Sequence, residues 1–465
     1  MTSNEARTSR PAAGPLSATT DQATPPHLLG NYAPVPDELT VTELPVTGAV
    51  PPELSGWYLR NGPNPHEAPS RHWFLGSGMV HGVRLDGGRA TAYRNRWVRT
   101  SSFTDGAQMH GPDGRLDLTA GHANTHVVRH AGRTFALVEA SYPYELDMRP
   151  GCELGTVGAY DFGGRLHTPM TAHPKTCPTT GELHFFGYGT VGAPPLTYHR
   201  ADADGKLTVS RPVEVAAPTM MHDFQLTERH VVFLDLPMVF DLELAVSGAT
   251  GLPFRWSPQE YGARLGVLRR DDPYGEVRWF EIEPCYVFHT VNAHEEDDRL
   301  VLHAMRYPDM SDGTLLAAPA TLWRWTADLA AGTVREEQLD DRAAEFPRID
   351  DRLAGRNARF GHVTADADPV GRAGAALHRY DLRSGAATSH VFGPGRTPGE
   401  AVFVPADDSP GGAGWLMTFV HDAATDRSDL VILDADRLAE APVATVHLPR
   451  RVPFGFHGSW LPDLG

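Results

Sequence analysis

The sequence predicts an all-β protein built as a β-propeller, and three observations lead to that fold class. Short runs rich in β-branched and aromatic residues alternate with polar turns along the chain. Many of these turns are of the Asp-Gly type, which joins the two strands of a β-hairpin. Long amphipathic helical patterns are scarce. Many short strands at even spacing over most of a 465-residue chain indicate radial repetition of hairpins, as in a propeller.

The predicted hairpins follow one another in chain order. The paired runs are 80–85 with 90–98, 196–200 with 207–215, 264–268 with 277–282, and 401–404 with 415–420. A further run, 376–382, leads into the turn at Ser384-Gly385. No Pro- or Ser-rich linker divides the middle of the chain, so we predict a single propeller domain over 31–465. A sandwich or two tandem β-domains are the alternatives.

Two segments depart from the hairpin pattern. Residues 1–30 are rich in Ser, Thr, Ala and Pro and lack the apolar core of a secretory signal, which predicts a disordered N-terminal tail. The segment Leu236–Pro258 is apolar and interrupted by glycines, which predicts a long loop or a short helix covering one face of the propeller. No run of 18 apolar residues occurs, so we predict no transmembrane helix.

Charge and composition exclude several classes of function. The net charge is −17, and so acidic a surface repels phosphate backbones, which argues against nucleic-acid binding. Only two lysines occur, Lys175 and Lys206, so few candidates exist for a Schiff-base lysine. Three cysteines with no CxxC spacing fit neither a disulfide framework nor a cysteine zinc site, which favours a reducing cytoplasm. The oligomeric state cannot be read from the sequence.

Three histidines occupy the same position in a repeated unit. His173, His222 and His289 each precede a polar turn and a β-rich run, which places them on the first strand of successive hairpins. The innermost strands of propeller blades face a central channel, where such imidazoles would converge and could bind iron, copper or zinc. His457, near the C-terminus, is a fourth candidate. His362 has a similar context, and a structural role for any of these histidines stays open on the pattern alone.

Three glutamates lie in matching contexts. Glu139 ends an apolar strand run, Glu345 lies in AEFPRID, and Glu400 precedes AVFVP. A single Glu in an apolar strand is unusual unless it is paired, and metal-bound His usually donates its second N–H to a carboxylate. The alternative is that these glutamates cap hairpins or pair with arginines.

A set of motifs resembles one known family, the carotenoid cleavage oxygenases, which include lignostilbene dioxygenases and retinoid isomerases. The resemblance spans roughly 33–464 and rests on motifs that occur in the family's order: LRNGPNP (Leu59–Pro65), HWFLGSGMVHGVRL (His72–Leu85), YRNRWVRT, ANTHVV, TAHPK, MHDF, FHTVNA, EFPRI, GEAVFVP and GFHGSW.

The resemblance implies a seven-bladed propeller with a dome of loops and helices over an iron(II) site. It implies that His173, His222, His289 and His457 bind the metal, and that Glu139, Glu345 and Glu400 hold the histidines. His362 is left out. The implied enzyme is a non-haem iron dioxygenase that uses O2 to cleave a carbon–carbon double bond into two carbonyl products. A retinoid-type isomerase, a metal-dependent hydrolase and a non-catalytic ligand-binding propeller are the rival hypotheses.

The substrate hypothesis rests on two positions of the resemblance. The stilbene branch of the family is understood to anchor a phenol with a Tyr and a Lys, and this chain has Trp97 and Val138 at the aligned positions. We therefore expect an apolar carotenoid or apocarotenoid, with a stilbene or phenylpropenoid as the alternative. Trp97, Val138, Phe288 and Phe456 are the predicted pocket residues. Because such substrates partition into lipid, Leu236–Pro258 could touch a membrane surface peripherally, and packing within the dome is the alternative.

Overall fold

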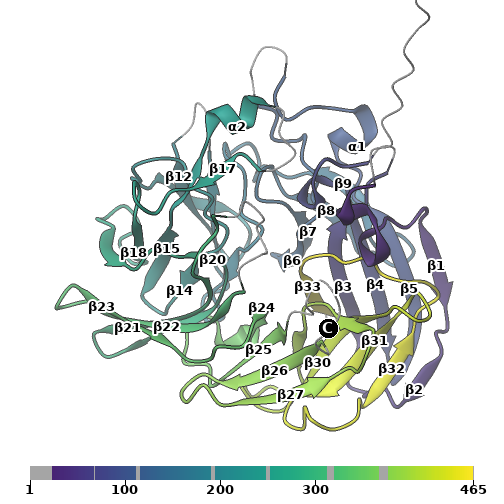
Figure 1. Cartoon of the computed structure of the whole chain (residues 1–465). Coiled ribbons are helices and arrows are strands. Elements are labelled where there is room, and N and C mark those ends of the chain that lie inside the picture. The colour runs from purple at the N-terminus through teal and green to yellow at the C-terminus, as the bar shows by residue number, and fades with distance from the viewer. Residues whose placement is uncertain are drawn as a thin grey trace, which may run out of the picture.

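Seven of the eight sheets in the described part of the chain are arranged in a ring as blades, and the eighth is a two-stranded sheet outside the ring. The computed structural model describes residues 24–66, 69–111, 116–189, 194–247, 252–311, 319–365 and 375–463. Each of the seven blades is antiparallel and contains four to six strands. Viewed down the ring, the colour passes from purple through teal and green to yellow, so the chain builds the blades in sequence order (Figure 1). The predicted seven-bladed β-propeller is therefore confirmed.

The first three blades carry the N-terminal half of the ring. Blade 1 contains β1 (Leu39–Thr42), β5 (Arg89–Trp97), β4 (Gly78–Asp86), β3 (Gly56–Pro63) and β33 (Gly458–Pro462). Blade 2 contains β6 (His126–His130), β7 (Arg133–Leu137), β8 (Tyr144–Asp147) and β9 (Gly155–Ala159). Blade 3 contains β10 (Lys175–Thr176), β11 (Leu183–Tyr188), β12 (Leu196–Ala201) and β13 (Leu207–Pro212).

The next three blades repeat the same four-stranded pattern. Blade 4 contains β14 (Gln225–Leu226), β15 (His230–Asp235), β18 (Ala263–Arg269) and β19 (Arg278–Ile282). Blade 5 contains β20 (Tyr286–Glu296), β21 (Arg299–Tyr307), β22 (Thr321–Asp328) and β23 (Thr333–Gln338). Blade 6 contains β24 (Ala344–Arg348), β25 (Phe360–Ala365), β26 (Ala376–Asp381) and β27 (Ala387–Val391).

Blade 7 and the two chain ends close the ring. Blade 7 contains β28 (Arg396–Pro398), β29 (Val402–Pro405), β30 (Gly414–Asp422), β31 (Arg427–Asp434), β32 (Ala444–His447) and β2 (Val46–Gly48). The C-terminal β33 pairs with β3 in register from Gly56↔Pro462 to Arg60↔Gly458. The N-terminal β2 pairs with β32. Backbone hydrogen bonds therefore join the two ends of the chain across blades 1 and 7.

Apolar side chains fill the spaces between neighbouring blades. Tyr286 and Trp325 of blade 5 have no exposed surface, and one continuous cluster joins them to Leu234 of blade 4 and Tyr380 of blade 6. The innermost strand of blade 5 is buried along nearly its whole length. A strand that is covered on both faces has a nearly continuous run of apolar residues in its sequence. The sequence YVFHTVNA, with which this strand begins, follows that pattern. The hairpins predicted from Asp-Gly-type turns occur at β4–β5, β12–β13, β18–β19 and β29–β30.

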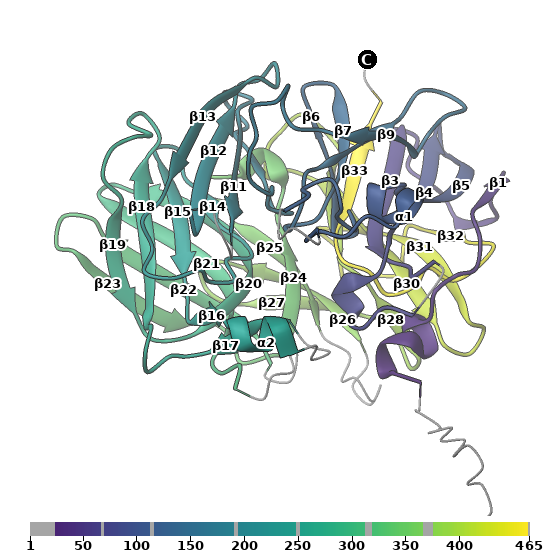
Figure 2. The same cartoon turned by 90° about the horizontal axis from the view of Figure 1, so that it is seen from above.

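A cover of short elements lies on one face of the ring. The segment Leu236–Pro258 forms a hairpin, β16 (Met238–Phe240) and β17 (Phe254–Trp256), with the helix α2 (Leu242–Ser247) between its strands. These elements project together from the propeller (Figure 2). The other helical segments are α1 (Ser101–Asp105), η1 (Pro26–Leu28), η2 (Gly30–Tyr32), η3 (Trp73–Leu75) and η4 (Asp351–Leu353).

The predicted tail lies mostly outside the described residues. Residues 1–23 are among those that the structure does not describe, and the end of the predicted tail falls within η1 and η2. Within the described ranges, no helix has the length and apolar character needed to cross a membrane.

Candidate metal centre

Four histidines from four different blades meet on the propeller axis. His289 lies in β20, and His457 directly precedes β33. His173 and His222 lie in irregular segments that lead into β10 and β14, slightly before the strands on which the sequence had placed them. One nitrogen of each imidazole lies within 4.8 Å of a nitrogen of every other, and all four residues are buried. The Nε2 atoms of His173 and His222 are 3.0 Å apart.

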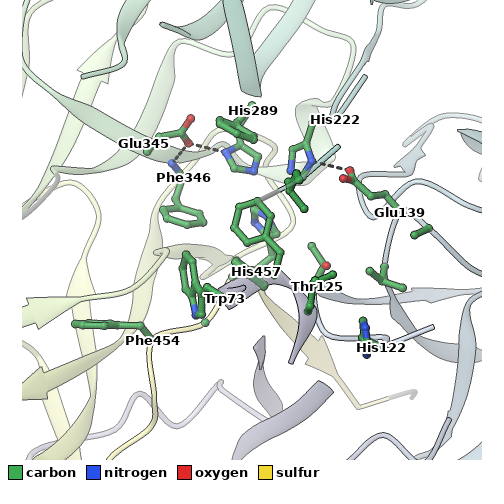
Figure 3. Close-up of a pocket in the computed structure, with 18 of the residues that line it drawn as sticks. Trp73, His122, Thr125, Glu139, His222, His289, Glu345, Phe346, Phe454 and His457 are labelled. Atoms are coloured by element: carbon green, nitrogen blue, oxygen red, sulfur yellow. Dashed lines mark hydrogen bonds and ion pairs between the residues drawn. The ribbon is translucent and has the colours of Figure 1, made fainter. Parts of the chain in front are cut away.

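Three of these histidines each donate a hydrogen bond from Nδ1 to a glutamate carboxylate. Nδ1 of His222 lies 2.7 Å from Glu139 and Nδ1 of His289 lies 2.6 Å from Glu345, two contacts drawn in Figure 3. Nδ1 of His457 lies 2.9 Å from Glu400. A carboxylate accepts the Nδ1 proton, which fixes the ring and turns Nε2 toward the centre.

The seven blades each contribute one group to this arrangement. Blades 1, 3, 4 and 5 supply the histidines. Blades 2, 6 and 7 supply the glutamates: Glu139 follows β7, Glu345 lies in β24, and Glu400 lies between β28 and β29. The propeller geometry, with every inner edge facing one axis, brings together residues that are far apart in sequence.

Burial and mutual repulsion favour the neutral form of two of the four imidazoles, those of His173 and His457. Burial, followed by the neighbouring imidazoles of His457, His222 and His289, lowers the pKa of His173 well below its ordinary value. Burial and the same kind of repulsion, led by His289, lower the pKa of His457. Burial also disfavours charge on His289, but the Glu345 carboxylate outweighs it and raises the pKa of that ring. Neutral imidazole is the form that binds a metal ion.

The donor set fits a divalent transition metal. Nε2 of His289 is buried and has no hydrogen-bond partner among the described residues, which is costly unless an ion or another group occupies the centre. The Nδ1 atoms of three rings are engaged by carboxylates, so their Nε2 lone pairs are free to coordinate. Four imidazoles suit iron, copper or zinc rather than calcium or magnesium, which take oxygen ligands.

A cavity of about 1070 Å³ adjoins the histidines, and its wall is largely aromatic and aliphatic. Trp73, Phe346 and Phe454 lie around His457 in Figure 3. Phe456 packs against Trp73, with ring centroids 4.6 Å apart. The cover adds Phe240, Leu242, Leu244, Val246, Leu252 and Phe254 to the wall. A wall of this kind holds an apolar ligand and excludes water from the centre.

Three of the four predicted pocket residues line this cavity. Val138, Phe288 and Phe456 are in its wall, and the ring of Phe288 packs edge-on against His222. Trp97 requires a correction, because it is not among the described residues that line the cavity. Its indole N–H donates to the Asn64 carbonyl at 3.0 Å, and its ring packs in a separate small cluster with Val35 and Met79.

Several wall residues were not predicted from the sequence. Trp73 and Thr125 lie within motifs of the family resemblance, and Phe346 directly follows Glu345. The sequence therefore contained information that could have placed these three residues near the centre. Nothing in the sequence indicated that Asn31 and Tyr32 would line the cavity, because they directly follow the predicted tail. Arg60 is a buried cation in the wall, and its guanidinium donates to the Pro453 carbonyl. His362 lies in β25 beside a separate cavity of about 190 Å³ and is not part of the cluster.

The sequence and the structure were compared with known proteins. The model of the family described as retinal pigment epithelial membrane protein matches residues 32–462. A carotenoid cleavage oxygenase of Mycobacterium tuberculosis is 41% identical, with 94% of this chain and 97% of that protein covered. The crystal structure of Pseudomonas brassicacearum lignostilbene dioxygenase has a TM-score of 0.83 at 30% identity, with 95% of this chain and 99% of that chain covered.

A cobalt-substituted Synechocystis apocarotenoid oxygenase gives a TM-score of 0.81 at 28% identity, covering 92% of this chain and 97% of that chain. The match therefore extends over nearly the whole chain. The chain belongs to the family of the carotenoid cleavage oxygenases and the retinal pigment epithelial membrane protein.

Proposed function

We propose that this protein is an iron(II)-dependent dioxygenase that cleaves a carbon–carbon double bond of a carotenoid or apocarotenoid, using O2, into two carbonyl products. The observation that carries the proposal is the buried cluster of His173, His222, His289 and His457 beside an apolar cavity. In this proposal the propeller over 31–465 acts as one domain. The three cysteines are free, which is compatible with a cytoplasmic location.

The side chains of the chain have separate tasks in this proposal. Iron(II) held by the four Nε2 atoms would supply the activation of O2. Glu139, Glu345 and Glu400 each hold an Nδ1 proton and keep the rings in one orientation. The aromatic wall positions an apolar polyene beside the centre and keeps water away. Four neutral ligands leave the positive charge of the ion uncompensated in the first coordination sphere.

A carotenoid or apocarotenoid fits the wall better than a phenolic stilbene. Neither lysine of the chain is among the described residues of the wall, because Lys175 is bound to Asp223 and Lys206 lies in an exposed turn. Val138, at the position aligned with the phenol-anchoring lysine, offers no charge. Arg60 is a cation in the wall, but its guanidinium is engaged by the Pro453 carbonyl. The relative that is 41% identical is named a carotenoid cleavage oxygenase.

Product analysis tests the activity and the substrate class together. Iron(II)-loaded protein in air is offered two pools, apocarotenals with β-carotene and 4-hydroxystilbenes with isoeugenol. Chromatography and mass spectrometry should detect shortened polyene aldehydes from the first pool only. Aromatic aldehydes from the second pool would favour the stilbene alternative. Metal content below one ion per chain after loading, with no product, would favour a non-catalytic binding propeller.

We also propose that the cover touches a lipid surface from which the substrate enters. Three apolar residues of α2 line the cavity and yet reach solvent: Leu242 is 61% exposed, Leu244 37% and Val246 77%. Val239 and Phe240 of β16 are only half-buried and pack within the hairpin, so α2 is the better place for substitutions. In liposome flotation, serine at the three α2 positions should reduce binding, whereas Val391→Ser on β27 should not. Equal flotation of both variants would refute the contact.

A further inference from the structure

One histidine of the cluster lacks the carboxylate support that the other three have. Among the described residues, no glutamate or aspartate contacts the His173 ring. Its backbone N–H donates to Thr171 Oγ1 at 3.1 Å, and Thr171 Oγ1 approaches the His222 carbonyl at 3.4 Å. His173 also lies in an irregular segment rather than in a paired strand. Something other than a carboxylate on its ring must therefore fix its position.

Lys175, two residues after His173, supplies that anchor. Its ammonium lies 2.8 Å from Asp223 Oδ1, and Asp223 directly follows His222. The side chain of Asp223 is 2% exposed and that of Lys175 is 17% exposed. A carboxylate buried this deeply is stable only when it is paired and hydrogen-bonded.

The second oxygen of Asp223 extends the connection to a third histidine. Asp223 Oδ2 accepts hydrogen bonds from the backbone N–H of Thr290 at 2.9 Å and from its hydroxyl at 2.6 Å. Thr290 directly follows His289. Gln225 donates to the same hydroxyl at 2.9 Å. One carboxylate thus ties together the segments that carry His173, His222 and His289, which come from blades 3, 4 and 5.

The fourth histidine has a separate clamp. Glu400 accepts from the Gly458 N–H at 2.7 Å and from Arg348 at 3.1 Å, and Arg348 also donates to the Gly458 carbonyl at 2.8 Å. This clamp serves His457 alone and does not reach His173.

We propose that Lys175 and Asp223 are positioning residues that set the affinity and the coordination geometry of the metal centre. The inference rests on the proposed metal centre and concerns the protein without substrate. Breaking the Lys175–Asp223 pair should release the His173 segment while the Glu-supported histidines keep their orientation. Loss of outer partners of metal ligands weakens metal binding by roughly 10- to 100-fold, and we expect that range for Lys175→Met.

The chain offers a matched control, because Lys206 is its only other lysine. Lys206 is exposed in the turn between β12 and β13. Lys206→Met therefore removes one lysine charge and adds the same side chain without touching the cluster. His222→Ala serves as the control that removes a proposed ligand.

Cobalt(II) is the probe, because its visible spectrum reports coordination geometry independently of turnover. Metal-free protein is titrated with cobalt(II) against a competing chelator. We expect Lys175→Met to bind about 10- to 100-fold more weakly than wild type, with a changed visible spectrum. Lys206→Met should match wild type in both. Affinity of Lys175→Met within about twofold of wild type with the same spectrum would overturn the proposal.

A double variant distinguishes a loss of positioning from a loss of folding. Lys175→Met leaves the Asp223 charge buried and unpaired, whereas Lys175→Met combined with Asp223→Asn removes both charges. We expect the double variant to fold and still to bind cobalt(II) weakly with the altered spectrum. Wild-type binding by the folded double variant would refute the positioning role. If instead wild type and His222→Ala bind cobalt(II) equally, the metal centre itself is wrong, which is a different result.

Discussion

At the residue scale, local patterns made the clustered histidines candidates, and the family resemblance selected them while leaving out His362. His173, His222 and His289 recur at one position of a repeated unit, and the structure brings them within 4.8 Å of one another together with His457. The pairing of each glutamate with one histidine could not be predicted, since it depends on which blades become neighbours. The environment of Trp97 was also missed, because an indole N–H finds its partner, the Asn64 carbonyl, only in the folded chain.

The first residue-scale prediction concerns His222. Replacement with alanine removes one donor and leaves Glu139 without its partner at 2.7 Å. We expect cleavage activity to fall by about 100-fold or more and the affinity for iron(II) to fall with it. Circular dichroism should show an unchanged β-sheet spectrum. The control is His447→Ala, which replaces a histidine whose side chain is 45% exposed. Full turnover by His222→Ala would show that His222 is not a ligand.

At the element scale, hairpins were predictable from turn chemistry, whereas contacts between elements were not. Asp-Gly-type turns identified β4–β5 and β12–β13, because Gly87, Gly88 and Gly205 have the positive φ that such turns require locally. The segment Leu236–Pro258 was expected as a loop or helix and forms a hairpin with a helix inserted between its strands. Its strand pairing depends on packing over the cavity, which leaves no periodic pattern in so short a run.

The second prediction concerns two glycines that let the C-terminal segment approach β3. A Cβ at Gly455 would lie 2.7 Å from the Asn61 carbonyl oxygen and 3.1 Å from Gly62 Cα. Gly455→Ala should therefore push His457 outward and weaken metal binding by roughly 10-fold or more. Gly87→Ala is the control for backbone strain alone, since a Cβ there meets no atom within 4 Å but its φ of +52° strains a turn that carries no histidine of the cluster. Unchanged cobalt(II) affinity in Gly455→Ala would show that the close approach is dispensable.

The third prediction concerns a bond between blades 4 and 5. Glu295, at the end of β20, accepts from His230 at 2.8 Å and from Thr227 and Arg229 in the turn before β15. Burial raises the pKa of Glu295, but the hydrogen bonds from His230, Thr227 and Arg229 outweigh it and lower that pKa to about 2, from an ordinary 4.5. The ionised form thus stabilises the fold above about pH 4.5, and this contribution is lost as the pH falls toward 2.

Substitution of Glu295 tests whether its contribution to the free energy of unfolding is lost as the pH falls. At neutral pH, Glu295→Gln should lower the free energy of unfolding by roughly 1–3 kcal/mol. The difference from wild type should shrink as the pH falls below about 4.5, because the unfolded wild-type chain then binds a proton at Glu295, whereas the folded protein binds it only toward pH 2. Urea unfolding at several pH values measures it. Glu281→Gln, on the exposed face of β19, is the control. A constant difference across this pH range would contradict the assignment.

At the scale of the whole molecule, the ring could be predicted and its closure only in part. Even strand spacing indicated radial repetition, and His457 near the C-terminus was a candidate for the centre. The double closure, with β33 on β3 and β2 on β32, joins residues some 400 positions apart and leaves no local signature. The number of blades followed from the family resemblance, since the variable turn lengths hide the repeat.

The fourth prediction concerns that closure. A chain ending at His457 keeps every proposed ligand but loses β33 and the Gly458 groups that bind Glu400 and Arg348. We expect a lower melting temperature, a broader unfolding transition and loss of metal binding. A chain lacking only residues 464–465 should behave as wild type. A cooperative transition at the wild-type temperature in the shorter chain would mean that blade 1 closes without β33.

The contribution of one group from every blade has a consequence for biosynthesis. The ribosome releases the segment that carries His457 last, and proteins fold from the N-terminus as they emerge. A growing chain can therefore assemble blades and pair some glutamates with histidines, but it cannot present all four imidazoles. Capture of the proposed metal ion has to wait until the His457 segment has left the ribosome and the ring is shut. The cellular supply of the ion at that moment, rather than its presence during synthesis, then decides how much of the protein becomes active.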